Sequence, residues 1–366
     1  MCMLERTLRL VRGYDWTLLI VVLLLTFVGL AAIYSVDLSK GDTLIFFPVQ
    51  TVAFLLGIVV LVLAASVHSV FYQSFSRIAY IGVFLLLAGV LVFGMTIRGT
   101  TGWFRIAGFS LQPAELAKVS LILFLSWIFY RHGRQYYKWQ FVASTILVVG
   151  LYVGLIMLQP DLGSAFILLS IWFGMLLFSN TKKRYIAFLV GVGVGAFLLG
   201  WFFLFAPYQK ARLMTFLDPS LDPLGSGYNV SQSVIAIGAG NVFGRGLGFG
   251  SQSQLHFLPE AQTDFIFAVI AEELGFVAVV GVFVLYSLLI WRILLLTRRC
   301  RDDFSSYVLL GIALLFFTQV VVNIGAATGV LPVTGVTLPF LSYGGSSLVI
   351  NFFLIGIALS VARSHT

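Results

Sequence analysis

The chain has 366 residues, of which 60% are hydrophobic and 10% are charged, and its formal net charge is +8. Soluble domains carry roughly 25% charged residues, so this composition excludes a protein whose main solvent is water. The cations are spread along the chain and form no patch interleaved with aromatic residues, which argues against a nucleic-acid partner.

Apolar stretches recur along the chain and determine the predicted fold. A helix needs about 20 such residues to cross the hydrocarbon core of a bilayer, and the short alternating strands of a membrane barrel are not seen. The sequence therefore predicts an all-α polytopic membrane protein with about ten transmembrane helices in one domain, residues 1–366. The spans are expected near residues 15–35, 46–66, 78–97, 114–130, 141–159, 162–179, 185–205, 264–291, 305–328 and 344–363.

The basic residues indicate the orientation of the spans. Fifteen of the 22 Lys and Arg fall near the termini or on alternate loops, and the positive-inside rule places that side, with both termini, in the cytoplasm. The first span is interpreted as a signal anchor, because its apolar stretch is too long for a signal peptide. The fifteen cations are Arg6, Arg9, Arg12, Arg77, Arg131, Arg134, Lys138, Lys182, Lys183, Arg184, Arg292, Arg298, Arg299, Arg301 and Arg363.

The fourth span opens with polar residues at the predicted outer face. Pro113 suits the first turn of a helix, and Glu115 stands three residues before Lys118, so the two can pair. This pair is interpreted either as an ion pair that holds helices together or as part of a pyrophosphate-binding site. Asp161 follows a Gln-Pro break and is expected to cap the sixth span.

Only one outer loop is long, about residues 206–263, between the seventh and eighth spans. Long loops in compact proteins are usually functional or disordered, and the aromatic and aliphatic content of this one favours order. Lys210 and Arg212 stand where the chain leaves the membrane. They either hold an anionic head group or extend to the interface.

Glycines are frequent within residues 238–250 of this loop. The segment lacks the strand-then-helix setting and the Gly-Lys-Ser/Thr sequence of a nucleotide-binding loop, so no nucleotide is expected. Its glycines are more typical of tight turns and of close backbone approach to a neighbouring segment.

The eighth span begins with Asp264. On an ideal helix Ala268, Ala271 and Gly275 share its face, so Asp264 is expected to point into the bundle or a cavity and away from lipid. The alternative is structural, because Thr263 or Asp264 could cap the helix.

Glu272 and Glu273 lie further along the same span. Charged groups at that depth are costly and are usually functional or paired, so Glu272 is a candidate substrate-binding residue. Glu273 points almost opposite to Asp264 on an ideal helix, which favours a structural role for it.

Residues 328–347 interrupt the apolar pattern with prolines and glycines before the last span. Backbone groups at membrane depth must be satisfied by protein or by a water-filled cavity, so a re-entrant or cavity-lining turn is expected. The turn offers hydroxyls such as that of Ser342, and backbone amides, but no titratable group. Its predicted role is to position a substrate.

Several segments, in this order, resemble the SEDS family (shape, elongation, division and sporulation) of bacterial cell-wall synthesis. The resemblance extends over essentially the whole chain. One departure is Gln262, where many family members carry His. The segments are residues 103–106, Gln112-Pro-Ala-Glu-Leu-Ala-Lys118, Gln159-Pro-Asp-Leu-Gly163, residues 251–260, residues 263–268, Glu272-Glu-Leu-Gly275 and residues 338–345.

The resemblance implies ten spans and a peptidoglycan glycosyltransferase at the outer face of the bacterial cytoplasmic membrane. It also implies lipid II and the nascent lipid-linked glycan as substrates, and a class B penicillin-binding protein, a transpeptidase, as partner. Asp264 matches the family's proposed catalytic acid. The short N-terminus and the amino-acid sequence of residues 253–260 are more similar to those of elongation-type members than to those of division-type members.

The mechanism expected from this resemblance needs a base for the attacking sugar hydroxyl and positive charge for the leaving pyrophosphate. Asp264 is the expected base, and Lys118, Arg105 and Arg212 are expected to stabilise the diphosphate. The four histidines show no zinc-ligand spacing, but a carboxylate and a pyrophosphate suit Mg²⁺ or Mn²⁺. The rival hypothesis is a lipid II flippase, because broken helices and intramembrane acids also mark transporters.

Overall fold

The computed structural model describes residues 15–39, 44–97, 100–106, 109–132, 136, 138–179, 181–205, 207–218, 222 and 225–364. In this part of the chain, nine helices are long and apolar enough to cross a membrane, and Leu162–Phe178 is a shorter apolar helix. The ten predicted spans therefore all correspond to helices. Arg6, Arg9, Arg12, Arg134 and Cys2 lie outside the described residues.

The elements follow in an order close to the predicted one. The membrane helices are α2 (Trp16–Leu38), α3 (Phe46–Ser66), α4 (Ser69–Phe93), α5 (Pro113–His132), α6 (Trp139–Leu158), α7 (Leu162–Phe178), α8 (Lys183–Leu199), which continues into a π-turn over Gly200–Leu204, α12 (Ile266–Thr297), α13 (Asp303–Ala327) and α14 (Gly345–Ser364). Three further helices, α9 (Pro207–Leu217), α10 (Ser226–Ala239) and α11 (Ser251–Gln254), lie between α8 and α12.

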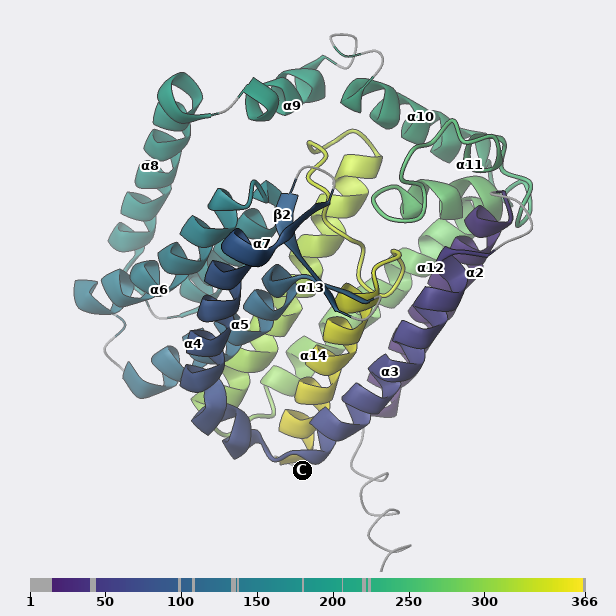
Figure 1. The fold of residues 1–366 in the computed structure, drawn as a ribbon. Coiled ribbons are helices and arrows are strands. Elements are labelled where there is room, and N and C mark those ends of the chain that lie inside the picture. Colours follow the sequence, from purple (N-terminus) through teal and green to yellow (C-terminus); the bar gives the residue numbers. More distant parts are fainter. Residues whose placement is uncertain are drawn as a thin grey trace, which may run out of the picture.

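The centre of the bundle is formed by α5, α13 and α14, which are mostly buried, while the other helices surround them (Figure 1). Small residues allow close packing there: a Cβ at Gly57 of α3 would lie 2.6 Å from Phe352 of α14. By contrast, α8 has no buried residue and stands apart at the edge of the bundle. Its exposed apolar side chains are therefore suited to contact lipid.

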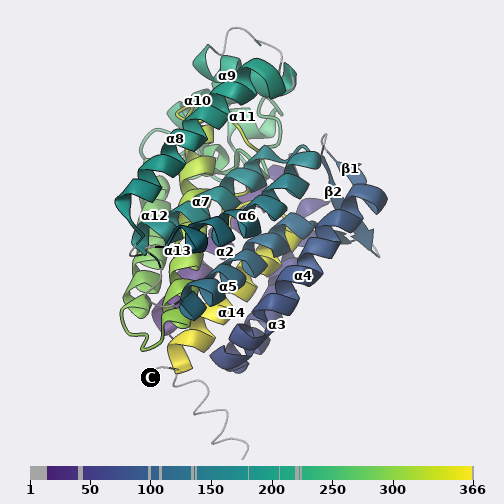
Figure 2. The same ribbon diagram turned by 90° about the vertical axis from the view of Figure 1, so that its left-hand side faces the viewer.

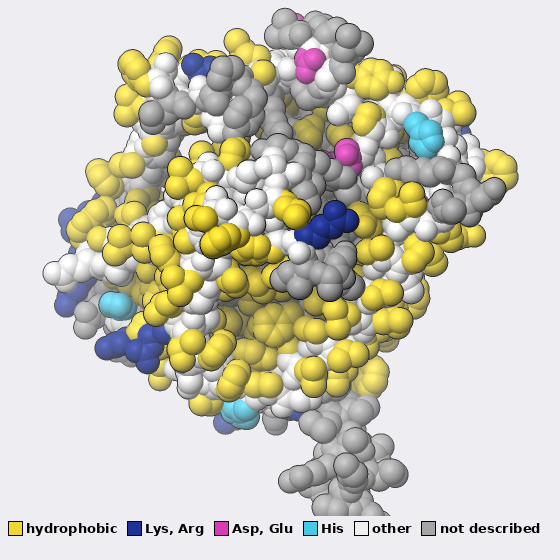
Figure 3. Space-filling model, in the orientation of Figure 1, with side chains coloured by type: hydrophobic (Ala, Val, Ile, Leu, Met, Phe, Trp, Pro, Cys, Tyr) yellow, Lys and Arg dark blue, Asp and Glu magenta, His cyan; other side chains and the backbone are white. Residues whose placement is uncertain are grey.

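One end of the molecule carries the polar segments. In both ribbon views α9 and α10 cross this end (Figures 1 and 2), which the basic-residue pattern assigns to the outer face. The described part of the long loop contains helices, which agrees with the order that its composition predicted. The view in Figure 3 shows hydrophobic side chains over most of the face and few charged ones near its middle.

A small antiparallel sheet follows α4, in the order β1 (Met95–Ile97), β2 (Thr100–Ile106) and β3 (Phe109–Leu111). The predicted third span, 78–97, was wrong at both ends. His68 caps the start of α4, and polar residues in its first turns obscured the helix in the hydropathy pattern. Gly94 ends it, because the extended backbone there leaves the helical path.

The eighth span also departs from the ideal helix that was predicted from residue 264. The helix begins at Ile266, after Asp264, and it breaks at Gly275, whose φ is 75° and ψ is −174°. The face calculated from offsets of 4, 7 and 11 residues therefore does not hold through Gly275.

The break at Gly275 is stabilised by the glycine-rich segment of the long loop. A Cβ at Gly240 would lie 1.8 Å from the carbonyl oxygen of Ala271, so only glycine fits. This contact confirms the predicted close backbone approach and satisfies peptide groups that the break exposes. The hydrogen bonds run from Arg245 N to Glu272 O (3.0 Å), from Gly246 N to Glu273 O (2.9 Å), from Phe276 N to Asn241 O (2.9 Å) and from Val277 N to Val242 O (3.1 Å).

Candidate functional site

A cavity of about 860 Å³ opens among the outer ends of the helices. That volume suits a ligand of several sugar-sized groups. Its walls come from α3, the β2–β3 hairpin, α5, α7, α10, the turn before α12, the segment before α14 and the first turn of α14. The polar side chains that line it include Arg105, Gln112, Glu115, Lys118, Asp161, Ser164, Glu260, Asp264, Thr337 and Ser347.

Asp264 lines this cavity and is partly exposed to it. It lies in a tight turn in which the amides of Thr263, Asp264 and Phe265 all point at the carbonyl oxygen of Glu260, at 3.0–3.4 Å. Phe265 occupies the cap position of α12 and makes no side-chain cap bond. The predicted cavity-facing carboxylate is thus present, and neither Thr263 nor Asp264 occupies the cap position of that helix.

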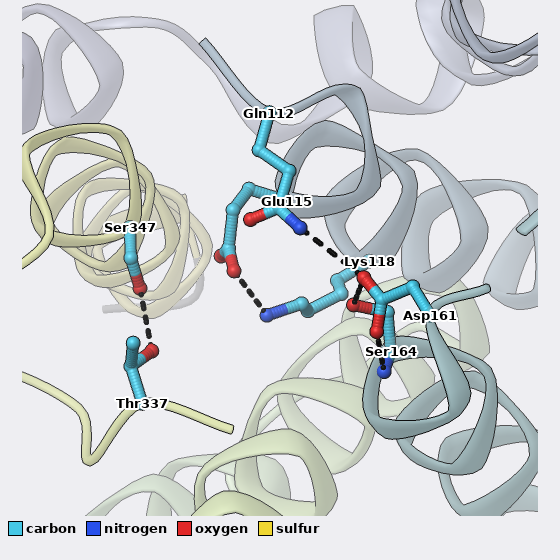
Figure 4. Close-up of polar contacts among 7 residues, drawn as sticks. All are labelled: Gln112, Glu115, Lys118, Asp161, Ser164, Thr337 and Ser347. Atoms are coloured by element: carbon cyan, nitrogen blue, oxygen red, sulfur yellow. Dashed lines mark hydrogen bonds and ion pairs between the residues drawn. The ribbon is translucent and has the colours of Figure 1, made fainter. Parts of the chain in front are cut away.

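Glu115 and Lys118 also line the cavity, from the first turns of α5, which begins at Pro113 as predicted. Their ion pair is 2.7 Å long and both side chains are buried. The second oxygen of Glu115 accepts no hydrogen bond within the described part of the chain. Figure 4 shows the Lys118 ammonium extending from α5 into the space between Glu115 and the Thr337–Ser347 pair.

Asp161 caps α7, as predicted: its Oδ1 accepts from Ser164 N at 2.9 Å and its Oδ2 from Ser164 Oγ at 2.7 Å (Figure 4). The same Oδ2 accepts from Gln112 Nε2 at 3.1 Å, which joins the sheet end of α5 to α7. Sequence analysis did not select Gln112 or Glu260, although both line the cavity. Their sequence signals are their places near Glu115 and Asp264 and within segments that resemble the family.

The structure places the other predicted cations in different regions. Arg105, on β2, is exposed and lines the cavity. Lys210 is on α9 and its Nζ lies 6.0 Å from the centre of the Trp201 ring, and it is not among the residues that line the cavity. Arg212 is also on α9, but its side chain lies outside the described residues. The structure therefore brings Arg105 and Lys118 into one cavity.

Ser342 has partners within the protein. Its hydroxyl donates to the carbonyl oxygen of Thr263 at 2.7 Å and accepts from Leu338 N at 2.9 Å. It is buried behind the cavity wall, whereas Tyr343 to Ser347 line the cavity. The predicted cavity-lining turn at residues 328–347 is present, and in it Ser342 anchors the segment before Asp264.

Glu272 and Glu273 are fully buried under α11 and are not among the residues that line the cavity. Each carboxylate accepts hydrogen bonds from three donors, which are backbone amides, hydroxyl groups or a side-chain amide. For Glu272 these are Gln252 N (2.8 Å), Ser253 N (3.1 Å) and Ser251 Oγ (3.3 Å); for Glu273 they are Ser35 Oγ (2.7 Å), Ser253 Oγ (3.0 Å) and Gln254 Nε2 (3.3 Å). The pair joins α2 and the long loop to α12.

The cavity thus sets a carboxylate, Asp264, on one wall and two cations, Lys118 and Arg105, on others. Within the described residues, no three His, Cys, Asp or Glu side chains are grouped as a metal cage. This arrangement suits a substrate that carries both hydroxyl groups and an anionic group.

The chain is similar over most of its length to known proteins. The model of a family described as "Cell cycle protein", FtsW/RodA/SpoVE, matches residues 15–366. Stage V sporulation protein E of Bacillus subtilis (strain 168) is 36% identical over 358 residues, with 95% of this chain and 97% of the relative covered. Peptidoglycan glycosyltransferase MrdB of Escherichia coli (strain K12) is 39% identical over 309 residues, covering 84% and 82%.

A solved structure described as "Structural coordination of polymerization and crosslinking by a peptidoglycan synthase complex" contains a similar chain. The TM-score is 0.82 and the identity is 34%, with 96% of this chain and 98% of the other covered. The likeness includes both the membrane helices and the segments between them, since nearly the whole length is matched.

Proposed function

The chain belongs to the FtsW/RodA/SpoVE family and is a peptidoglycan glycosyltransferase of the bacterial cytoplasmic membrane, and we propose that it polymerises lipid II with Asp264 as its general base. The observation that carries this proposal is the placement of Asp264 in the same cavity as Lys118 and Arg105. An acid without nearby cations would give a base but would leave the departing diphosphate unstabilised.

The proposed reaction joins two lipid-linked sugars. The Asp264 carboxylate accepts the proton of the acceptor 4-hydroxyl as that oxygen attacks the anomeric carbon of the donor. The bond between this carbon and the diphosphate oxygen breaks, and the electron pair leaves with the diphosphate. Attack from the side opposite to the leaving group inverts the anomeric configuration.

Lys118 and Arg105 are proposed to stabilise the leaving diphosphate. Lys118 is fixed by the 2.7 Å bond to Glu115, so its ammonium need not reorganise when the charge develops. Arg105 is exposed on β2, where its guanidinium can approach a second phosphate. Lys210, on α9, would act on lipid head groups outside this cavity.

A divalent cation fits the same proposal. Asp264 is the carboxylate proposed to contact it, and Mg²⁺ or Mn²⁺ would neutralise diphosphate charge. Because the described residues form no protein cage, the substrate phosphates would supply most of the oxygen ligands. Polymerisation should then stop in a chelator and return with added Mg²⁺ or Mn²⁺.

The biological role is proposed to be cell elongation, together with a class B penicillin-binding protein that cross-links the product. The amino-acid sequence of residues 253–260 supports the elongation role. The similarity to a chain from a synthase complex that coordinates polymerization and crosslinking supports the proposed partner. Expression in cells that lack either their elongation or their division polymerase tests this. Rescue of division alone would contradict the elongation role.

The flippase hypothesis predicts acids near the bilayer centre with access from both faces. Here the two acids furthest along the eighth span, Glu272 and Glu273, are held by loop donors under α11. The deciding experiment supplies lipid II to the outer leaflet of liposomes that contain the protein and its partner. Wild type should form glycan polymer and Asp264→Asn should not. Equal polymer from both would remove Asp264 as the base.

A further inference from the structure

The backbone of Asp264 is held by a side chain from another helix. Asn323 of α13 donates from its Nδ2 to the carbonyl oxygen of Asp264 at 3.1 Å and to that of Val336 at 2.8 Å. Val336 lies on the cavity wall formed by the segment before α14. One amide group therefore joins the residue that carries the carboxylate to the wall beside it.

The segment before Asp264 is fixed to the same wall by other bonds. Ser342 Oγ donates to Thr263 O at 2.7 Å, and Tyr343 N donates to Gln262 O at 2.8 Å. Gln50 of α3 in turn holds this wall, because its Nε2 donates to Ser342 O and its Oε1 accepts from Gly344 N, both at 3.1 Å. The carbonyl groups of residues 262, 263 and 264 thus each accept a hydrogen bond, and Asn323 is the donor to the last of them.

Asn323 is well suited to this task. Two carbonyl oxygens can be satisfied only by the NH₂ group of the amide, so the orientation of the side chain follows from its partners. The residue is 2% exposed, where a carbonyl that lost its donor would have no water to replace it. Asp264 lies in the turn between Thr263 and Phe265. A shift of its carbonyl group rotates the backbone of Asp264 and therefore moves the side-chain carboxylate.

We propose that Asn323 is a positioning residue for glycosyl transfer, which sets the Asp264 carboxylate against the acceptor hydroxyl by holding its carbonyl to the cavity wall. This inference rests on the proposed role of Asp264 as base. Asn323 is not among the residues that line the cavity, so it acts through Asp264 and has no direct contact with a bound sugar.

The chain provides a matched control one turn away. Gln319 is on the same helix, is 0% exposed and is also an amide, but neither its oxygen nor its nitrogen has a partner within the described residues. Replacing it by Leu removes an equally buried amide without releasing any carbonyl. Gln319→Leu therefore measures what loss of a polar side chain from α13 does by itself.

The experiment measures kcat and KM for lipid II with the full chain and its partner in liposomes, for wild type, Asn323→Leu and Gln319→Leu. Asn323→Leu should lower kcat on the order of 100-fold, because small displacements of a reacting group have that effect, and should leave KM within about two-fold. Gln319→Leu should leave both constants unchanged. Equal losses in the two variants, or a rise in KM alone for Asn323→Leu, would overturn the proposal.

Asn323→Asp keeps the shape of the side chain and covers the case in which Asn323→Leu does not fold. Its ionised carboxylate faces two carbonyl oxygens and cannot donate, whereas its protonated form has one donor. The kcat of this variant relative to wild type should therefore fall as pH rises, and a constant ratio would contradict the proposal. If Asp264→Asn retains full activity the proposed function fails. If only the Asn323 variants do, this inference fails alone.

Discussion

Asp264 lies in the turn just before α12 and Glu272 lies within the first two turns of that helix, yet the surroundings of the two acids differ. Asp264 faces a cavity that also contains Lys118 and Arg105. Glu272 is fully buried and accepts hydrogen bonds from two backbone amides and a hydroxyl of the long loop. If Asp264 is the base, as proposed, the feature that distinguishes it from Glu272 is what each carboxylate faces.

The same difference distinguishes an acid that can act in catalysis from an acid that stabilises the fold. A carboxylate that is saturated by backbone donors fixes a loop to a helix and has little capacity left for a substrate. A carboxylate beside an open volume can exchange a proton with whatever enters. Each of the following substitutions tests one side of this division.

The largest effect is expected at Asp264. Asp264→Asn should reduce the rate of polymerisation about 10²–10⁴-fold, the usual contribution of a general base. The thermal unfolding midpoint should stay close to that of wild type, because the side chain is partly exposed. Rates from lipid II consumption and unfolding followed by intrinsic fluorescence measure the two effects. A large loss of stability would indicate that Asp264, like Glu272, has a structural role.

The Glu115–Lys118 pair should show both effects at once. Lys118→Met leaves the buried Glu115 without its cation, which should cost about 3–5 kcal/mol of stability and most of the activity. Adding Glu115→Gln should restore much of the stability, because no buried charge remains unpaired. It should not restore activity, since the cation for the diphosphate is still missing. Activity that returns with stability would assign the pair a purely structural role.

Glu272→Gln should mainly change stability. Hydrogen bonds to a charged group contribute about 1.5–3 kcal/mol, and part of this is lost when the acceptor becomes neutral. The specific activity of the folded protein should remain within about three-fold of wild type. Thermal unfolding and polymerisation of the purified variant check these values. A loss comparable to that of Asp264→Asn would break the comparison.

The smallest effect concerns Cys300, which follows the far end of α12 and is not among the residues that line the cavity. Burial, with a smaller contribution from Asp302, raises the pKa of its thiol to about 12. Roughly one thiol in ten thousand is then ionised at pH 8. In a Cys2→Ser background, a maleimide should label the native protein at least ten-fold more slowly than the denatured protein. Equal rates would show that burial does not lower the reactivity of the Cys300 thiol.

Much of the fold follows from the sequence. Ten apolar stretches predicted the ten helices, and Asp161 and Pro113 marked helix starts through purely local rules. The third span was misplaced because its first turns are polar, and the sheet of residues 95–111 has strands too short to give an alternating signal.

The site was less predictable, because its contacts join distant parts of the chain. Asp264 was identified from a helical face that the break at Gly275 does not preserve, although the residue does face a cavity. Glu272 gave the same signal as Asp264, and only its donors in residues 251–253 distinguish it. Asn323 gave no signal, since an amide in an apolar helix acquires meaning only from the carbonyls that it meets.

The most direct test of the account is a structure of the Asp264→Asn variant bound to a lipid-linked sugar diphosphate. The account predicts the diphosphate within about 3 Å of Lys118 Nζ, with Arg105 beside it and an acceptor hydroxyl at residue 264. A diphosphate bound on α9 near Lys210, with no sugar in the cavity, would contradict it.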